Sequence, residues 1–153
     1  MAQAGFLGQG MKFPPQTNPA TGRFETVSAE ESVKESVYLI LMTQKTERPM
    51  LPEFGTNLMS YTFMDMNYTQ LNMIIRTIKD QLMVQEPRIR DVDITADLES
   101  RPGAVLFQID YTVRDTNTRD NLVFPFYLNA EGPEEEEEEE EYEPEDVAEE
   151  ISD

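Results

Sequence analysis

The sequence of 153 residues contains no cysteine and no histidine. Without cysteine there is no disulfide framework and no thiolate nucleophile, and without histidine there is no imidazole base. Zinc sites built from nitrogen and sulfur ligands are excluded for the same reason. A serine nucleophile would lack its usual base, and no Gly-x-Ser-x-Gly motif is present. Most catalytic classes are therefore excluded, and we expect no cofactor and no metal site.

Basic residues and long apolar runs are also scarce. The chain has 12 basic against 31 acidic residues, and 15 of the acids lie in the last 23 positions. The bases are scattered and form no stripe, which argues against nucleic-acid binding. The longest apolar runs, Val37–Met42 and Leu122–Leu128, fall far below the roughly 20 residues of a membrane span. With no basic and apolar leader at the N-terminus, we expect a soluble cytoplasmic protein.

The first part of the chain predicts an arm followed by a helix. Residues 1–27 are rich in glycine and proline and show no sustained period, which predicts an extended N-terminal arm. The segment Ser28-Ala-Glu-Glu31 has the form of a capping box. Apolar residues at helical spacing follow it and predict a helix over about 29–43. Residues 44–57, with two prolines and a glycine, predict an ordered loop.

A second helix is predicted from Leu71 to Leu82, where apolar residues recur at i, i+3, i+4, i+7 and i+11. It must end near Glu86, because Pro87 disfavours a helical conformation in the residue before it. Between the loop and this helix, the alternating apolar residues Met59, Tyr61 and Phe63 suggest a short strand.

After Pro87 the hydrophobic period changes to two. Three alternating runs, over 92–98, 105–113 and 122–128, predict an antiparallel meander. The fold class is therefore α+β, with two amphipathic helices packed on an antiparallel three- to four-stranded sheet over residues 28–130. Pro125 cannot donate to a ladder, so the last strand is predicted to be an edge. Residues 131–153 contain eight consecutive glutamates and predict a disordered acidic tail.

Glu86-Pro87-Arg88 is the first candidate site. Glu86 falls at the C-terminal end of the second helix, where a negative charge opposes the helix dipole. Such a carboxylate usually has a cationic partner. Arg88 or Arg90 of the same chain is one candidate, and a group on another protein is the other.

Several carboxylates are candidate catalytic groups. Glu53, Glu86, Asp91 and Asp93 are the acids to test for glycosidase chemistry, which needs two of them across one cleft. Nothing in the sequence places any two together, so surface carboxylates are the simpler interpretation. Asp91-Val-Asp93 begins like a calcium loop but lacks its third ligand and glycine.

Three features together favour an assembly component. They are the predicted edge strand over Leu122–Leu128, the N-terminal arm, and seven methionines between Met42 and Met83. A strand edge offers backbone donors and acceptors to a visiting strand, and methionine suits adaptable contacts.

Four segments of this chain, in order and spacing, resemble one family. They are Phe6–Pro15, Thr43–Gly55, Glu86–Ile89 and Asn121–Tyr127. The sequence is similar to the small baseplate-wedge, or sheath-initiator, proteins of contractile tails. These include the lysozyme-like tail baseplate proteins of phages and relatives in type VI secretion and extracellular contractile injection systems.

The resemblance implies structural work rather than catalysis. It implies that Glu86, Pro87 and Arg88 contact the helical core of the wedge, which favours an intermolecular role for Glu86. It also implies that the edge strand, with Leu122, Val123, Phe124, Pro125 and Phe126, starts the sheath by strand pairing. The expected partners are the sheath protein and wedge proteins, and contact with the hub, spike or inner tube is allowed.

The resemblance further implies six copies per baseplate, assembled in a bacterial cytoplasm. The acidic tail is not part of the family pattern. The alternative function is a peptidoglycan-cleaving, lysozyme-like enzyme of the tail that uses Glu53 or Glu86.

Overall fold

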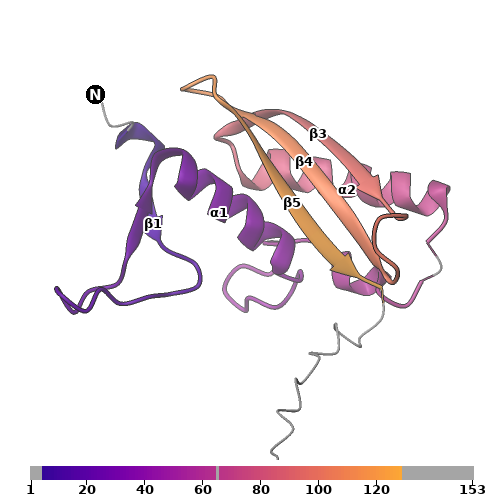
Figure 1. Cartoon of the computed structure of the whole chain (residues 1–153), viewed down its shortest axis with the longest axis horizontal. Helices are drawn as coiled ribbons and strands as arrows, with labels where there is room; N and C mark the ends of the chain where they lie inside the picture. Colours follow the sequence, from indigo (N-terminus) through magenta and orange to yellow (C-terminus); the bar gives the residue numbers. More distant parts are fainter. Residues whose placement is uncertain (1–4, 65, 129–153) are drawn as a thin grey trace, which may run out of the picture.

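The structure, a computed structural model, describes residues 5–64 and 66–128. These residues form an α+β fold with two α-helices, a three-stranded sheet and a two-stranded ribbon, which confirms the predicted class (Figure 1). Helix α1 (Ala29–Met42) and helix α2 (Tyr68–Gln85) occupy the predicted segments. The acidic tail predicted over 131–153 lies outside the described residues.

The main sheet is the predicted antiparallel meander. It consists of β3 (Ile89–Asp97), β4 (Ala104–Val113) and β5 (Arg119–Tyr127), with β4 in the centre. The register places Ile94, Ile109 and Leu122 side by side on one face. Their neighbours Asp93, Asp110 and Asn121 are aligned on the opposite face. One face is therefore apolar and the other polar, as the period of two requires.

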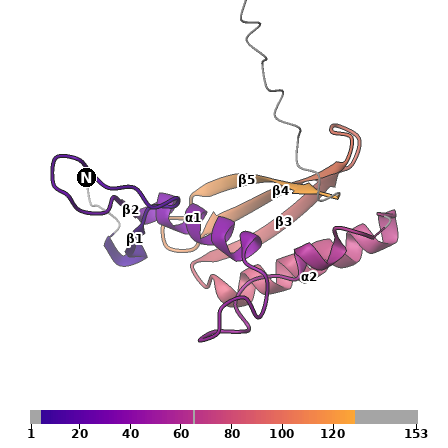
Figure 2. The ribbon, with the colours of Figure 1, turned by 90° about the horizontal axis from the view of Figure 1, so that it is seen from below.

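Both helices pack on the apolar face of the sheet (Figure 2). Helix α2 lies along β3, and α1 lies beside β5. The core contains apolar residues from every one of these elements. Among its fully buried side chains are Val33, Val37, Ile40, Leu41, Ile74, Ile78, Leu82, Ile89, Phe107, Ile109 and Tyr111.

The N-terminal residues pair with each other, which the sequence did not predict. A 3-10 turn (Gly5–Leu7) leads into β1 (Gln9–Met11), which pairs antiparallel with β2 (Thr26–Ser28). The resulting ribbon extends away from the main sheet in Figure 1. Leu7 is 1% exposed and belongs to the core, so the ribbon is attached to the domain at its base.

Two local predictions are wrong. Ser28 is the N-cap residue of α1, but its hydroxyl makes no capping hydrogen bond, and Ala29 after it has φ +55° instead of a helical value. The N–H of Ala29 donates instead to the Gly8 carbonyl at 3.3 Å. The strand suggested by Met59, Tyr61 and Phe63 is a 3-10 turn (Leu58–Tyr61), in which only Leu58 is buried.

The loop over residues 44–57 is ordered, as predicted, and is seated on both helices. The Thr56 N–H donates to the Thr43 carbonyl at 2.9 Å, at the end of α1. The Gln85 side chain, in the last turn of α2, accepts from the Gly55 N–H at 2.8 Å and donates to the Gly55 carbonyl at 2.9 Å. It also donates to Gln81 at 2.8 Å. One amide side chain thus fixes the loop against α2.

Candidate functional site

Glu86 and Arg88 form a bidentate ion pair just after α2. Glu86 is the C-cap residue, with its N–H on the Leu82 carbonyl at 2.9 Å. Arg88 donates from Nε to Glu86 Oε1 and from Nη2 to Oε2, both at 2.6 Å. Pro87 between them is exposed and prevents further helix. Two parallel charge-assisted bonds give the pair a fixed geometry.

The same guanidinium also holds the N-terminal turn. Arg88 Nη1 donates to the Leu7 carbonyl at 2.7 Å, across 81 positions of sequence. Gly8 follows at φ +84°, where glycine is not strained, and the chain then enters β1. The ion pair therefore joins the end of α2, the start of β3 and the N-terminal turn.

The carboxylate of Glu86 is charged in spite of its burial. Glu86 is 2% exposed, and this burial raises its pKa. The hydrogen bonds from Arg88 and Ser36 and the positive charge of Arg88 outweigh the burial, so the pKa of Glu86 lies below its usual value. In turn Glu86 raises the pKa of Arg88. The ion pair is thus fully formed near neutral pH.

The sequence suggested Arg88 or Arg90 as the partner of Glu86 within the chain, and the structure places Arg88 there. Arg90 is directed elsewhere and contacts Asp91 at 3.5 Å and the Asn117 side chain. The third member of the site, the Leu7 carbonyl, was missed. A backbone oxygen carries no sequence signal, so only the fold reveals it.

Strand β5 is the second candidate surface, and it has one strand neighbour within the described residues. Its register with β4 is continuous. At its ends the Thr118 carbonyl accepts from Val113 and the Leu128 N–H donates to Gly103, both at 2.9 Å. Backbone groups alternate between the two edges of a strand, so even-numbered residues face β4 and odd-numbered residues face the free edge.

The odd-numbered residues at this edge include Val123, which is 55% exposed, and Pro125. Proline is tolerated there because its missing N–H would not point at β4. The side chains of Phe124 and Phe126 are buried on the core face, at 3% and 2% exposure. The prediction that the last strand is an edge of the sheet is confirmed.

Helix α1 runs beside this strand on the core side. Lys34 Nζ lies 3.4 Å from Asp120 Oδ1, and the Tyr38 ring meets the Phe124 ring with centroids 6.0 Å apart. Tyr111 on β4 donates to Asp120 Oδ2 at 3.2 Å. These contacts fix the position of β5 and leave its polar face uncovered.

The four acids suggested by the sequence for catalysis lie in different surroundings. Glu53 has an 88% exposed side chain and lies 3.7 Å from Lys45, whereas Glu86 is buried on Arg88. A general acid needs a raised pKa, and that of Glu86 is lowered. Asp91 and Asp93 line a polar hollow of about 460 Å³ on the outer face of the sheet.

Within residues 5–64 and 66–128, no three acidic side chains are grouped so that they could hold a metal ion. No helix in that part of the chain is long and apolar enough to cross a membrane.

The site thus has a buried ion pair that joins three segments, and the sheet has an open edge. In the comparison with protein families, residues 27–118 match the model of the family "Baseplate wedge protein gp25". The chain therefore belongs to this baseplate wedge family of contractile tails. Among curated proteins, none matches it.

Three solved structures are similar to the chain. A proposed tail lysozyme from Geobacter sulfurreducens is 43% identical, with a TM-score of 0.63 over 69% of this chain and 96% of that one. A chain of the anti-feeding prophage baseplate is 23% identical, with a TM-score of 0.55 over 82% of this chain and 90% of that one. A chain of the type VI secretion baseplate complex is 20% identical, with a TM-score of 0.53 over 63% and 91%. The last two establish a shared fold.

Proposed function

We propose that this chain is a non-enzymatic component that joins the baseplate wedge and pairs its β5 edge with the sheath protein. The observation that carries the proposal is the open edge of β5, where Val123 and Tyr127 direct N–H groups away from β4. An extended segment of a partner adds to such an edge through backbone hydrogen bonds. The exposed side chain of Val123 lies beside the path of that segment.

The contact to the wedge is proposed at Pro87 and Arg88. Pro87 is exposed, and 28% of the Arg88 side chain is accessible. Arginine has five N–H donors, of which three are used within the chain, so two remain for a partner. Glu86 acts through Arg88 in this proposal, because its own carboxylate is buried and bonded at both oxygens.

The proposed partners are the sheath protein and the neighbouring wedge proteins, with one copy of this chain in each of six wedges. Assembly would take place in the bacterial cytoplasm, followed by a permanent position in the baseplate. The family membership supports the baseplate position, and the two candidate surfaces supply separate contacts for wedge and sheath.

Cleavage of peptidoglycan is the alternative, suggested by the description of the Geobacter relative. Its chemistry would require Glu53 or Glu86 as a proton donor. The Arg88 contact keeps Glu86 ionised, and Glu53 is on an exposed loop. The structural function is therefore the better supported of the two.

The test is co-expression of the cognate sheath and tube proteins with this chain, followed by negative-stain electron microscopy. We expect Val123→Pro to abolish sheath that starts at the baseplate, because it removes an outward N–H and leaves the β4–β5 ladder intact. Val123→Thr keeps the N–H and is the matched control. Normal sheath from a folded Val123→Pro variant would contradict strand pairing at this edge.

A further inference from the structure

The N-terminal turn is attached to the domain by a buried side chain and two hydrogen bonds. Leu7 is 1% exposed, whereas Phe6 before it is 66% exposed. The Leu7 carbonyl accepts from Arg88 at 2.7 Å, and the Gly8 carbonyl accepts from Ala29 at 3.3 Å. The bond from Arg88 is the charge-assisted one of the two.

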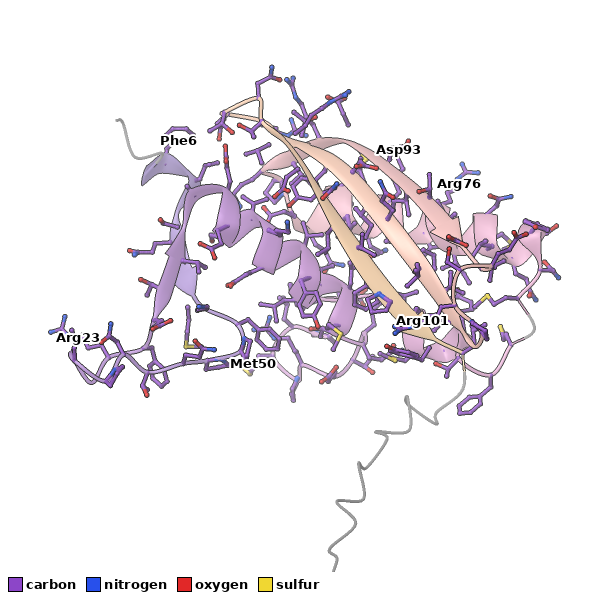
Figure 3. The ribbon with its side chains drawn as sticks, in the orientation of Figure 1. Phe6, Arg23, Met50, Arg76, Asp93 and Arg101 are labelled. Atoms are coloured by element: carbon purple, nitrogen blue, oxygen red, sulfur yellow. The ribbon has the colours of Figure 1, made fainter. Side chains whose placement is uncertain are left out.

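The ribbon that follows carries large apolar side chains exposed to solvent. Met11, Phe13 and Phe24 are 53%, 39% and 60% exposed. Figure 3 shows Phe6 on the N-terminal turn and Arg23 at the far end of the loop that joins β1 and β2. The direction of these side chains depends on how the base of the ribbon is fixed to the domain.

Only one end of the ribbon is fixed by chain connectivity. Strand β2 continues directly into α1, so its position follows from the helix. Strand β1 has no such continuation and is held by its pairing with β2, by the Phe13 N–H on Glu35 at 3.2 Å, and by the turn bound to Arg88. Loss of the Arg88 contact therefore affects the segment before β2 first.

We propose that Glu86 and Arg88 are a latch that docks residues 5–12 on the domain and fixes the orientation of the ribbon. Glu86 orients the guanidinium at two points, and the remaining Nη1 binds the Leu7 carbonyl. Lysine cannot replace this arginine, because an ammonium group has no planar fork with donors on separate atoms. The proposal extends the proposed function, since a wedge partner at Arg88 would contact the group that positions the ribbon.

Hydrogen exchange of the full-length chain, without any partner, tests the latch. In Arg88→Gln we expect the amides of Gly10 and Lys12, which face β2, to exchange about tenfold faster or more, because a hydrogen bond to a charged group is lost. Amides of β4 should exchange at the wild-type rate. Arg88→Lys should show the same local change. Arg90→Gln removes a nearby exposed arginine with other partners and should leave Gly10 and Lys12 protected.

Unchanged exchange of Gly10 and Lys12 in a folded Arg88→Gln variant would overturn the proposal. Loss of the whole fold in both Arg88→Gln and Arg88→Lys would also overturn it, because the pair would then support the core. Pro87→Glu separates this proposal from the wedge contact. It alters the exposed surface and leaves the latch in place, so it should block baseplate incorporation with wild-type exchange at Gly10 and Lys12. If Pro87→Glu is incorporated into the baseplate normally while Arg88→Gln exchanges faster at Gly10 and Lys12, the wedge contact is refuted and the latch is supported.

Discussion

Replacing Gly55 with alanine should destabilise the domain through a backbone clash. Gly55 has φ +102°, and a Cβ built there would lie 2.2 Å from the Thr43 carbonyl oxygen and 2.8 Å from its carbon. These are backbone atoms at the end of α1, so no side-chain rotation relieves the contact. Positive φ costs a non-glycine residue about 1–3 kcal/mol, and overpacking adds about 1–3 kcal/mol. We therefore expect Gly55→Ala to lose about 2–6 kcal/mol of unfolding free energy.

Gly103 provides the matched control. It has φ +74°, and nothing lies within 4 Å of its built Cβ. Gly103→Ala therefore pays for the backbone conformation alone, about 1–2 kcal/mol. Urea denaturation of both variants, followed by circular dichroism, gives the two losses under the same conditions. Equal losses would refute the argument that the close approach of the loop to α1 requires glycine at position 55.

The remaining predictions concern the buried polar groups. Because the pKa of Glu86 is lowered in the folded state, its ion pair contributes full stability above the unfolded pKa of about 4.5, and this contribution is lost as the pH falls through the folded pKa. The stability difference between wild type and Glu86→Gln, from melts at pH 3 to 7, should therefore shrink below about pH 4.5; a constant difference would contradict the ion pair. Tyr111→Phe should cost about 1–2 kcal/mol at neutral pH, because the hydroxyl donates to the charged Asp120. Urea titration measures that loss, with Tyr68→Phe as the comparison at a tyrosine that is 73% exposed.

The sequence predicted most elements because their signals are local. The apolar positions of α2 and the alternation in β3, β4 and β5 match the buried residues of the structure. The edge position of β5 followed from Pro125, since a missing donor is tolerated where no strand is bonded.

Elements that depend on distant partners were not predictable in this way. The ribbon strands are three residues each, too short for a visible period, and they exist because they pair with each other. Ser28 stands at the N-cap of α1 as expected, but its hydroxyl makes no capping hydrogen bond. At the site, the Glu86–Arg88 pair is local and was among the sequence candidates. The Leu7 carbonyl is 81 positions away and depends entirely on the fold.

The Gln85 contacts with the loop before α2 couple two parts of the folded domain. Gln85 occupies the last turn of the helix, and its partners at Gly55 lie 30 positions earlier. The amide can reach both backbone groups of Gly55 only when the helix extends to its final turn. Fraying of that turn therefore also removes these contacts to the loop. Gln85 thus links the stability of the loop to that of the helix end where the ion pair begins.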